Sequence, residues 1–393
     1  MLSLRDIDFK GKKVLLRVDF NVPLKERQIA DDTRIQASLD TINYILGKGG
    51  RLIVISHLGR PKGKKVKEMS LAPVARWLSS LILKPVKFIS DCIGPEVEDA
   101  IAGLKECEPI LLENLRFYKE EEENDLEFSR KLAGSSDVYV NDAFATAHRA
   151  HASTEGVTNF IKIKAPGFLM EKEIEWLSKV CESPSHPFLV ILGGAKVSTK
   201  IDVIENLLPK CDKLLVSGGI SYTFFRSQGK RVGSSIVEED KLDVAKKILD
   251  MGGDTLLLPS DAVVANKFTE DAEIRVVEEI PDGWMGVDIG PSTIERYKGE
   301  IESAKTILWN GPPGVFEIDK FLNGTKEIAH ALKNAKEKGA VVIAGGGDTA
   351  SAINKLGLKD GFTHISTGGG ASLEFLAGKK LPGIVALMSG ETG

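Results

Sequence analysis

The two halves of this chain carry different kinds of anion-binding residue. The first half carries arginines and a histidine where apolar runs end, and the second half carries glycine-rich loops that contain lysine or aspartate. Guanidinium groups bind phosphate and carboxylate bidentately and keep their charge, while glycine loops bring backbone N–H groups close to phosphates. With no evident covalent nucleophile, the pattern predicts two phosphate-bearing ligands on separate lobes and direct phosphoryl transfer between them.

The candidate residues of the first half follow apolar runs. They are Asp19 and Asn21 in RVDFNVP, His57 and Arg60 in HLGRP, Arg116 in ENLRF, Arg149 in NDAFATAHRAH, and Arg34 where a helix is expected to begin. One arginine near a strand end is usually a surface ion pair, but several at one sheet edge indicate a site for a small, multiply anionic substrate. We expect structural roles for the remaining histidines, His148, His151, His186, His330 and His364.

The segment GGGDT, residues 345–349, lies between an apolar run and a helical pattern. Its glycines suit a phosphate at a helix N-terminus. Asp348 would repel a bare phosphate but suits one that arrives with Mg²⁺, which favours one or two carboxylates plus phosphate oxygens. The same stretch also fits G-x-G-x-x-A, which is typical of a dinucleotide site, although HISTGGG lacks the acidic residue expected to close the next strand.

Two further loops of the second half carry charged side chains. GGAKVSTK places Lys196 and Lys200 four residues apart, so that a helix beginning there would direct both ammonium groups to one phosphate chain. WNGPPGVFE combines rigid turns with Asn310 and Glu317, a carboxylate that would suit ribose hydroxyls.

Parallel β-sheets must position these residues. Short apolar runs alternate with helical patterns throughout the chain, and nearly every run ends in a polar or glycine-rich loop. In open α/β sheets ligands bind at the carboxyl ends of the strands. Residues 168–182 form an amphipathic helical pattern between two proline-containing segments, which predicts a connecting helix, and a hinge, at a domain boundary.

Length and composition limit the possible functions. A chain of 393 residues predicts two domains, and a net charge of −4 argues against nucleic-acid binding. The lack of an apolar stretch of about 20 residues argues against a membrane span, and the charged N-terminus favours a cytoplasmic location. We interpret the four widely spaced cysteines as small buried residues rather than ligands of zinc or parts of disulfides, and the acidic run 120–123 as a solvated loop face.

In combination and in this order, the motifs resemble those of the phosphoglycerate kinase family over nearly the whole chain. RVDFNVP, HLGRP, ENLRF, DAFATAHRAHAST, GGAKVSTK, WNGPPGVFE, GGGDT and STGGGASLEFL carry the resemblance. It implies an α/β fold of two Rossmann-like lobes with parallel sheets, joined by an interdomain helix, with the active site in the cleft. Residues 1–167 would bind phosphoglycerate, with 376–393 packing back on them, 168–182 would form the connecting helix, and 183–375 would bind the nucleotide.

The same resemblance implies the reaction and its participants. The expected reaction is reversible, in-line transfer of the acyl phosphate of 1,3-bisphosphoglycerate to MgADP after domain closure, giving 3-phosphoglycerate and MgATP. The expected enzyme is a cytoplasmic monomer that needs Mg²⁺ and has no nucleic-acid or membrane partner.

Carried over residue by residue, the resemblance assigns three groups of site residues. The substrate-binding group is Asp19, Asn21, Arg34, His57, Arg60, Arg116 and Arg149. The nucleotide-binding group is Lys196, Lys200, Asn310, Glu317, Gly345, Gly346, Gly347, Asp348 and Thr349, with Asp348 on magnesium and Glu317 on the ribose. The catalytic group is Arg34, Lys196, Gly346 and Gly369. One departure is Ala145, where the resemblance predicts glycine, and alanine would be costly there if the position needed a positive φ or a close backbone approach.

Two other functions fit parts of the pattern. The G-x-G-x-x-A match favours an NAD-dependent dehydrogenase, and the two lobes favour a binding protein that closes on a phosphorylated metabolite without chemistry. ADP release from 3-phosphoglycerate and MgATP separates both from a kinase.

Overall fold

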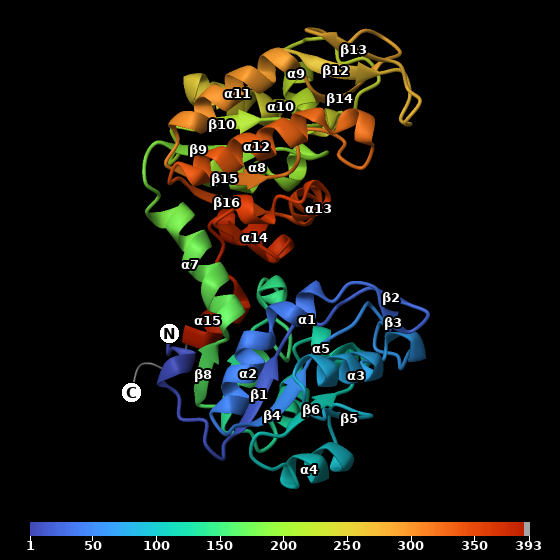
Figure 1. Cartoon of the computed structure of the whole chain (residues 1–393), viewed down its shortest axis with the longest axis vertical. Helices are drawn as coiled ribbons and strands as arrows, with labels where there is room; N and C mark the ends of the chain where they lie inside the picture. Colours follow the sequence, from blue (N-terminus) through green and yellow to red (C-terminus); the bar gives the residue numbers. More distant parts are fainter. Residues whose placement is uncertain (389–393) are drawn as a thin grey trace. The chain divides into compact units, whose positions relative to one another are not determined.

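The computed structural model describes residues 1–388, which form two compact units (Figure 1). Unit 1 contains residues 1–174 and 380–388, and unit 2 contains residues 175–379. The expected connecting helix is α7 (Phe168–Glu182), and the division between the units falls inside it. The chain rejoins unit 1 at Lys380, later than the expected residue 376, and residues 389–393 of that expected return lie outside the described residues.

Unit 1 is built on a six-stranded sheet whose paired strands all run parallel. In spatial order its strands are β5 (Lys87–Ile89), β6 (Pro109–Leu112), β4 (Arg51–Ile55), β1 (Lys13–Arg17), β7 (Val138–Asn141) and β8 (Ile163–Pro166). Successive side chains of a strand point to opposite faces. In β1, Val14 and Leu16 join one core cluster, while Leu15 between them is equally buried outside that cluster. Burial on both faces explains why the strand is a continuous apolar run.

Helices and short 3₁₀ turns complete unit 1. The α-helices are α1 (Thr33–Ala37), α2 (Leu39–Gly47), α3 (Ala72–Leu81), α4 (Pro95–Ala102), α5 (Lys119–Glu122), α6 (Leu126–Ala133) and α15 (Pro382–Met388). The 3₁₀ turns are η1 (Leu4–Asp6), η2 (Lys67–Met69), η3 (Leu115–Phe117), η4 (Phe144–Thr146) and η5 (Gly156–Asn159). A small hairpin pairs β2 (Leu24–Lys25) with β3 (Gln28–Ile29). The late helix α15 belongs to this unit, where the N–H of Gly383 donates to the carbonyl of Ala147 at 2.9 Å.

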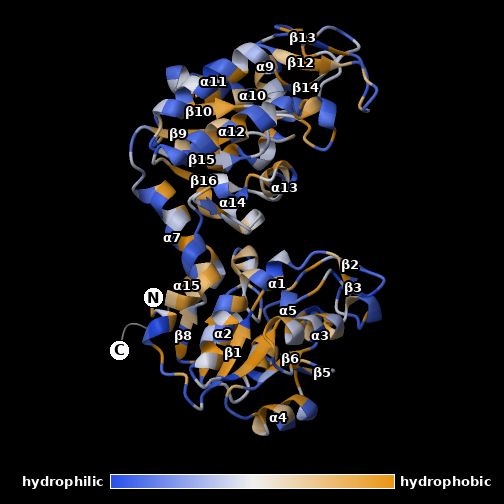
Figure 2. Ribbon diagram, in the orientation of Figure 1, coloured by the Kyte–Doolittle hydropathy of each residue, from blue (hydrophilic) through white to orange (hydrophobic). Residues whose placement is uncertain are grey.

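Unit 2 repeats the parallel architecture. Its six-stranded sheet has the order β11 (Leu256–Leu257), β10 (Lys213–Val216), β9 (Phe188–Leu192), β15 (Thr306–Asn310), β16 (Val341–Gly345) and β17 (His364–Ile365). The strands of both parallel sheets are largely hydrophobic, as β1 and β10 illustrate (Figure 2). Trp309 in β15 and Tyr297 in the covering helix α11 (Pro291–Ser303) are fully buried in one cluster, which fixes that helix on the sheet.

The other elements of unit 2 include a second sheet that the sequence did not predict. It is antiparallel, with β12 (Ala262–Ala265) between β13 (Ile274–Val277) and β14 (Met285–Ile289). The remaining α-helices are α8 (Ile201–Leu207), α9 (Ile220–Ser227), α10 (Leu242–Gly252), α12 (Asn323–Glu337), α13 (Gly347–Leu356) and α14 (Gly370–Leu376). The 3₁₀ turns are η6 (Val197–Thr199), η7 (Glu239–Lys241), η8 (Gly253–Thr255), η9 (Asp319–Phe321) and η10 (Lys359–Gly361).

The structure confirms the α/β class with two parallel sheets, and it adds strands that are too short to read from sequence. β5 and β8 span three and four residues, and such short runs carry little periodic signal. Within residues 1–388, every helix falls short of the length and apolar character that crossing a bilayer demands.

Candidate functional site

Four neighbouring strands of unit 1 deliver charged side chains to the carboxyl edge of the sheet. β6, β4, β1 and β7 are adjacent in that order, and Arg116, His57, Asp19 and Arg149 each follow one of them along the chain. The pKa of His57 lies well below its ordinary value because burial disfavours the charged ring, and because Arg17, Arg116, Arg149 and Arg34 add positive charge around it. The expected convergence of arginines on one sheet edge is therefore present.

Asp19 and Asn21 hold Arg34 at this edge. Nη1 of Arg34 donates to Asp19 Oδ2 at 2.8 Å and to the carbonyl of Asn21 at 3.2 Å. Oδ1 of Asn21 accepts from the N–H of Gly59 at 2.9 Å, which ties the loop after β1 to the loop after β4. Arg34 follows the first residue of α1, as expected, and its side chain remains 41% exposed, so the guanidinium is anchored and still accessible to a ligand.

Arg116 and Arg149 approach from η3 and from the segment after η4. Arg116 is buried, and its Nη1 donates to the carbonyl of Gly59 at 2.9 Å. Its Nη2 has no protein partner among the described residues, and a buried donor of this kind calls for a ligand or water acceptor. Arg149 is half-buried. Arg60 is exposed in the loop that follows β4.

Three buried residues belong to this cluster although the sequence did not single them out. Arg17 Nη2 lies 3.1 Å from His57 Nδ1, Arg17 Nε donates to Ser153 Oγ at 2.9 Å, and Ser153 Oγ donates to Glu121 Oε1 at 2.6 Å. The sequence feature that indicates Arg17 is its spacing of two residues from Asp19 and of four from Asn21, since side chains two residues apart lie on the same face of an extended backbone. The prediction that the acidic run 120–123 is a solvated face is wrong for Glu121, which is fully buried in α5.

Ala145 does not strain the backbone at the position where glycine was expected. It lies in the 3₁₀ turn η4, a conformation with negative φ, and it is absent from the residues with positive φ. The structure therefore removes the concern about a positive φ at this alanine. His151, for which we expected a structural role, is buried beside the arginines, and its pKa is lowered to about 3 by burial and then by Arg116, Arg17 and Arg149.

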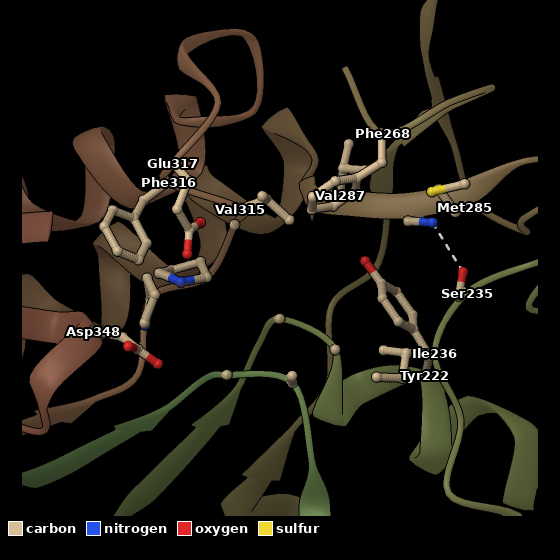
Figure 3. Close-up of a pocket in the computed structure, with 18 of the residues that line it drawn as sticks. Tyr222, Ser235, Ile236, Phe268, Met285, Val287, Val315, Phe316, Glu317 and Asp348 are labelled. Atoms are coloured by element: carbon tan, nitrogen blue, oxygen red, sulfur yellow. Dashed lines mark hydrogen bonds between the residues drawn. The ribbon is translucent and has the colours of Figure 1, made fainter. Parts of the chain in front are cut away.

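Unit 2 contains a pocket of about 430 Å³. Glu317 and Asp348 lie on one side of it, with Phe316 and Val315, and an apolar wall formed by Tyr222, Ile236, Phe268 and Met285 lies on the other (Figure 3). An apolar wall facing two carboxylates suits a flat, largely apolar ring that carries polar groups at one end.

The glycine loop and the WNGPPGVFE loop meet beside this pocket. β16 ends at Gly345, directly opposite Asn310 at the end of β15, and α13 begins at Gly347. Gly346 has φ +97°, which glycine tolerates without strain. Thr349 accepts a hydrogen bond from the N–H of Gly311 at 2.8 Å, so the loops are joined. Gly369, at the start of α14, also has a positive φ of +53°.

Lys200 and Lys196 differ in environment, and the expectation that they share one helix face is wrong. The segment between them forms η6, and α8 starts only at Ile201. Lys200 is buried and donates to Oδ1 of Asn310, and burial lowers its pKa to about 8 while Asp348 opposes the shift. Lys196 is exposed.

The apolar pocket wall was not predicted from the sequence. Tyr222 lies in α9, Ile236 in a loop, and Met285 in the unpredicted strand β14. Single apolar residues on separate elements have no shared spacing that would mark them as a site.

All four cysteines are free, and Cys107 and Cys181 are only half-buried, so the prediction of buried residues is wrong for these two.

Known proteins resemble this chain over its whole length. The sequence model described as phosphoglycerate kinase matches residues 4–379. The phosphoglycerate kinase of Dictyoglomus turgidum is 57% identical over 392 residues, and that of Chloroherpeton thalassium is 54% identical over 390 residues, each comparison covering 98% of both chains. The solved structure of phosphoglycerate kinase from Coxiella burnetii is 42% identical, with a TM-score of 0.90 and 98% of each chain covered. That from Pyrococcus horikoshii OT3 is 35% identical with a TM-score of 0.85, covering 99% of this chain and 98% of the other.

Proposed function

Because this chain belongs to the phosphoglycerate kinase family, we infer that it catalyses reversible transfer of the acyl phosphate of 1,3-bisphosphoglycerate to MgADP, giving 3-phosphoglycerate and MgATP. The observation that carries this function is the convergence of four arginines on buried His57 in unit 1. A small ligand with one phosphate and one carboxylate matches such a cluster in charge and size. Asp19, Asn21 and Arg116 complete the proposed substrate site, and we also assign Arg60 to it as an accessible cation.

The nucleotide is proposed to occupy the pocket of unit 2. Its base would lie against Tyr222 and the neighbouring apolar side chains, and Glu317 would accept hydrogen bonds from ribose hydroxyls. The phosphates would bind the backbone N–H groups at the start of α13, together with Lys200. The depressed pKa of Lys200 supports this assignment, since a buried ammonium whose hydrogen-bond acceptor is the neutral amide of Asn310 is the kind of group that a phosphate stabilises.

Asp348 fits a magnesium ion that arrives with the nucleotide. It is an exposed carboxylate in the first turn of α13, beside the pocket, and the described residues contain no cluster of three or more candidate metal ligands. That donor set suits Mg²⁺, which is usually held by one or two carboxylates plus substrate phosphates and water. When bound, the ion neutralises charge on the phosphate oxygens.

The remaining residues would act on the transferring group. We propose that Arg34 and the exposed Lys196 stabilise the charge that develops on this group, and that the backbone N–H groups at Gly346 and Gly369 donate hydrogen bonds to its oxygens. Transfer requires the ligands of the two units to meet, and closure around them would exclude water that otherwise hydrolyses the acyl phosphate. A cytoplasmic location and a monomeric state stay predictions, the latter testable by sedimentation.

A single assay tests the function. Purified protein mixed with 3-phosphoglycerate and MgATP should release ADP, and omission of either substrate should abolish the release. Addition of NAD⁺ and a 2-hydroxy acid in a parallel sample should leave nicotinamide absorbance unchanged. Binding of 3-phosphoglycerate without ADP release would contradict the kinase and favour a binding protein.

A further inference from the structure

A buried chain of hydrogen bonds links helix α5 to His57 inside unit 1. The two carboxylate oxygens of Glu121 accept from the Oγ and the N–H of Ser153, at 2.6 and 2.9 Å. Ser153 Oγ accepts from Arg17 Nε at 2.9 Å, and Arg17 Nη2 lies 3.1 Å from His57 Nδ1. Relative exposure is 0% for Glu121 and Ser153, 1% for Arg17 and 3% for His57, so water does not compete for these bonds.

The chemistry of arginine fixes the direction of every hydrogen in this chain. A guanidinium group donates and never accepts. Ser153 Oγ therefore accepts from Arg17 and directs its own hydrogen to Glu121. By the same argument, Nδ1 of His57 must accept from Arg17, which leaves the hydrogen of the neutral ring on Nε2.

Charge explains why Glu121 is needed at the far end of the chain. A buried guanidinium is strongly destabilising unless it is paired, and three more arginines act on the same histidine. Glu121 faces Arg17 from within the core. Burial raises the pKa of Glu121, and attraction to Arg17 opposes that rise. Arg116 also favours the charged form of this carboxylate, and Nδ1 of His151 lies 3.9 Å from its Oε1.

We propose that Glu121 is a positioning residue for the phosphoglycerate site, which acts through Ser153 and Arg17 to hold His57 as the Nε2–H tautomer. His57 then presents a neutral hydrogen-bond donor to an anionic oxygen of the ligand, and the ring cannot offer an acceptor lone pair at Nε2. The inference rests on the proposed function, since the ligand is the phosphoglycerate of that reaction.

A purely structural role for Glu121 predicts different results. The same region is also held by Tyr139, whose hydroxyl donates to the carbonyl of Ser153 at 2.6 Å, and by the N–H of Ala152, which donates to the carbonyl of Glu121 at 2.9 Å. If Glu121 served only to hold this loop, its replacement would lower stability and would change the affinities for both substrates together or not at all.

Steady-state kinetics of Glu121→Gln separate the two roles. Glutamine keeps the shape and an acceptor oxygen but removes the charge. We expect the KM for 3-phosphoglycerate to rise about tenfold, as loss of one hydrogen bond to a charged group predicts, while the KM for MgATP stays within about twofold. Glu123→Gln, on an exposed glutamate just beyond the same helix, should change neither. Equal changes in both KM values, or no change in either, would overturn the proposal.

The tautomer itself is measurable by NMR of protein labelled with ¹⁵N-histidine. Wild-type His57 should show a hydrogen on Nε2 and a bare Nδ1, and Ser153→Ala, which breaks the chain at its centre, should shift this equilibrium toward the other tautomer. A hydrogen on Nδ1 in the wild type would refute the proposal even if neither variant folds. Failure of the wild type to release ADP would instead refute the proposed function and leave the tautomer result standing.

Discussion

The buried ammonium of Lys200 makes nucleotide affinity depend on pH in a way that single substitutions should remove. Burial lowers its pKa to about 8, so the free enzyme carries the charge below pH 8 and loses it above. At pH 9 about nine-tenths of the molecules would lack it, and kcat/KM for MgATP, which reports pKa values of the free enzyme, should fall about tenfold between pH 7 and pH 9.

Two substitutions at Lys200 test this origin of the pH dependence. Lys200→Met removes the charge at every pH and should reduce kcat/KM at pH 7 by about ten- to hundredfold, as expected for one charge-assisted interaction of about 1.5–3 kcal/mol. Lys200→Arg keeps a charge that cannot be lost and should abolish the decline above pH 8. Lys246→Met, on an exposed lysine of α10, serves as the control.

The assay is ADP release at saturating 3-phosphoglycerate and limiting MgATP, from pH 6.5 to 9.5. An unchanged decline above pH 8 in Lys200→Met would show that another group titrates, and the reasoning from burial would be refuted.

Three further predictions concern catalysis and stability. Arg34→Ala and Lys196→Ala should each lower kcat by about 10²- to 10³-fold and change KM far less, and wild-type turnover in either variant would contradict the assigned role. Asp142 is fully buried, accepts from the N–H groups of Leu169 and Met170 and has its pKa raised to about 6, first by burial. Between about pH 4 and pH 6 the folded state therefore keeps a proton that the unfolded chain releases, so stability falls by up to about 3 kcal/mol as the pH rises through this range. Asp142→Asn should remove this loss, which urea unfolding at about pH 4 and about pH 6 would measure. Gly311→Ala should lower the free energy of unfolding by more than about 2 kcal/mol, because an added Cβ would lie 2.2 Å from the carbonyl oxygen of Gly193. Gly299→Ala, in open space within α11, should raise the free energy of unfolding by up to about 1 kcal/mol. Equal unfolding midpoints for the two variants would contradict this prediction.

Much of the candidate site could be predicted because its residues lie next to regular elements. The loop GGGDT joins β16 to α13 as its sequence predicts, since glycine and helix-capping signals act over a few residues. Lys196 and Lys200 show the limit of such local reasoning. Their spacing suits an α-helix, but a 3₁₀ turn intervenes and leaves one lysine exposed and the other buried.

The pocket wall lay beyond prediction because it depends on long-range packing. Tyr222 and Met285 contribute to one pocket from a helix and from an edge strand of the antiparallel sheet, and neither lies in a pattern that distinguishes a ligand contact from a core residue. The burial of Glu121 depends on long-range packing as well, because an acidic run is usually solvated and only the surrounding fold buries this one carboxylate.

The sequence by itself determined the two parallel sheets, the loops that carry anion-binding side chains and the family to which the chain belongs, because strand periodicity, glycine turns and motif order are local properties of the chain. Only the tertiary structure decided which charged side chains are buried and which of them lie close together. Arg17 and Ser153 are 136 positions apart, yet their hydrogen bond is buried, and the order of strands in the sheet is what brings them together. Burial then shifts the pKa values of His57, Glu121 and Lys200, because the free energy of a charge depends on its surroundings in space and not on its neighbours in sequence.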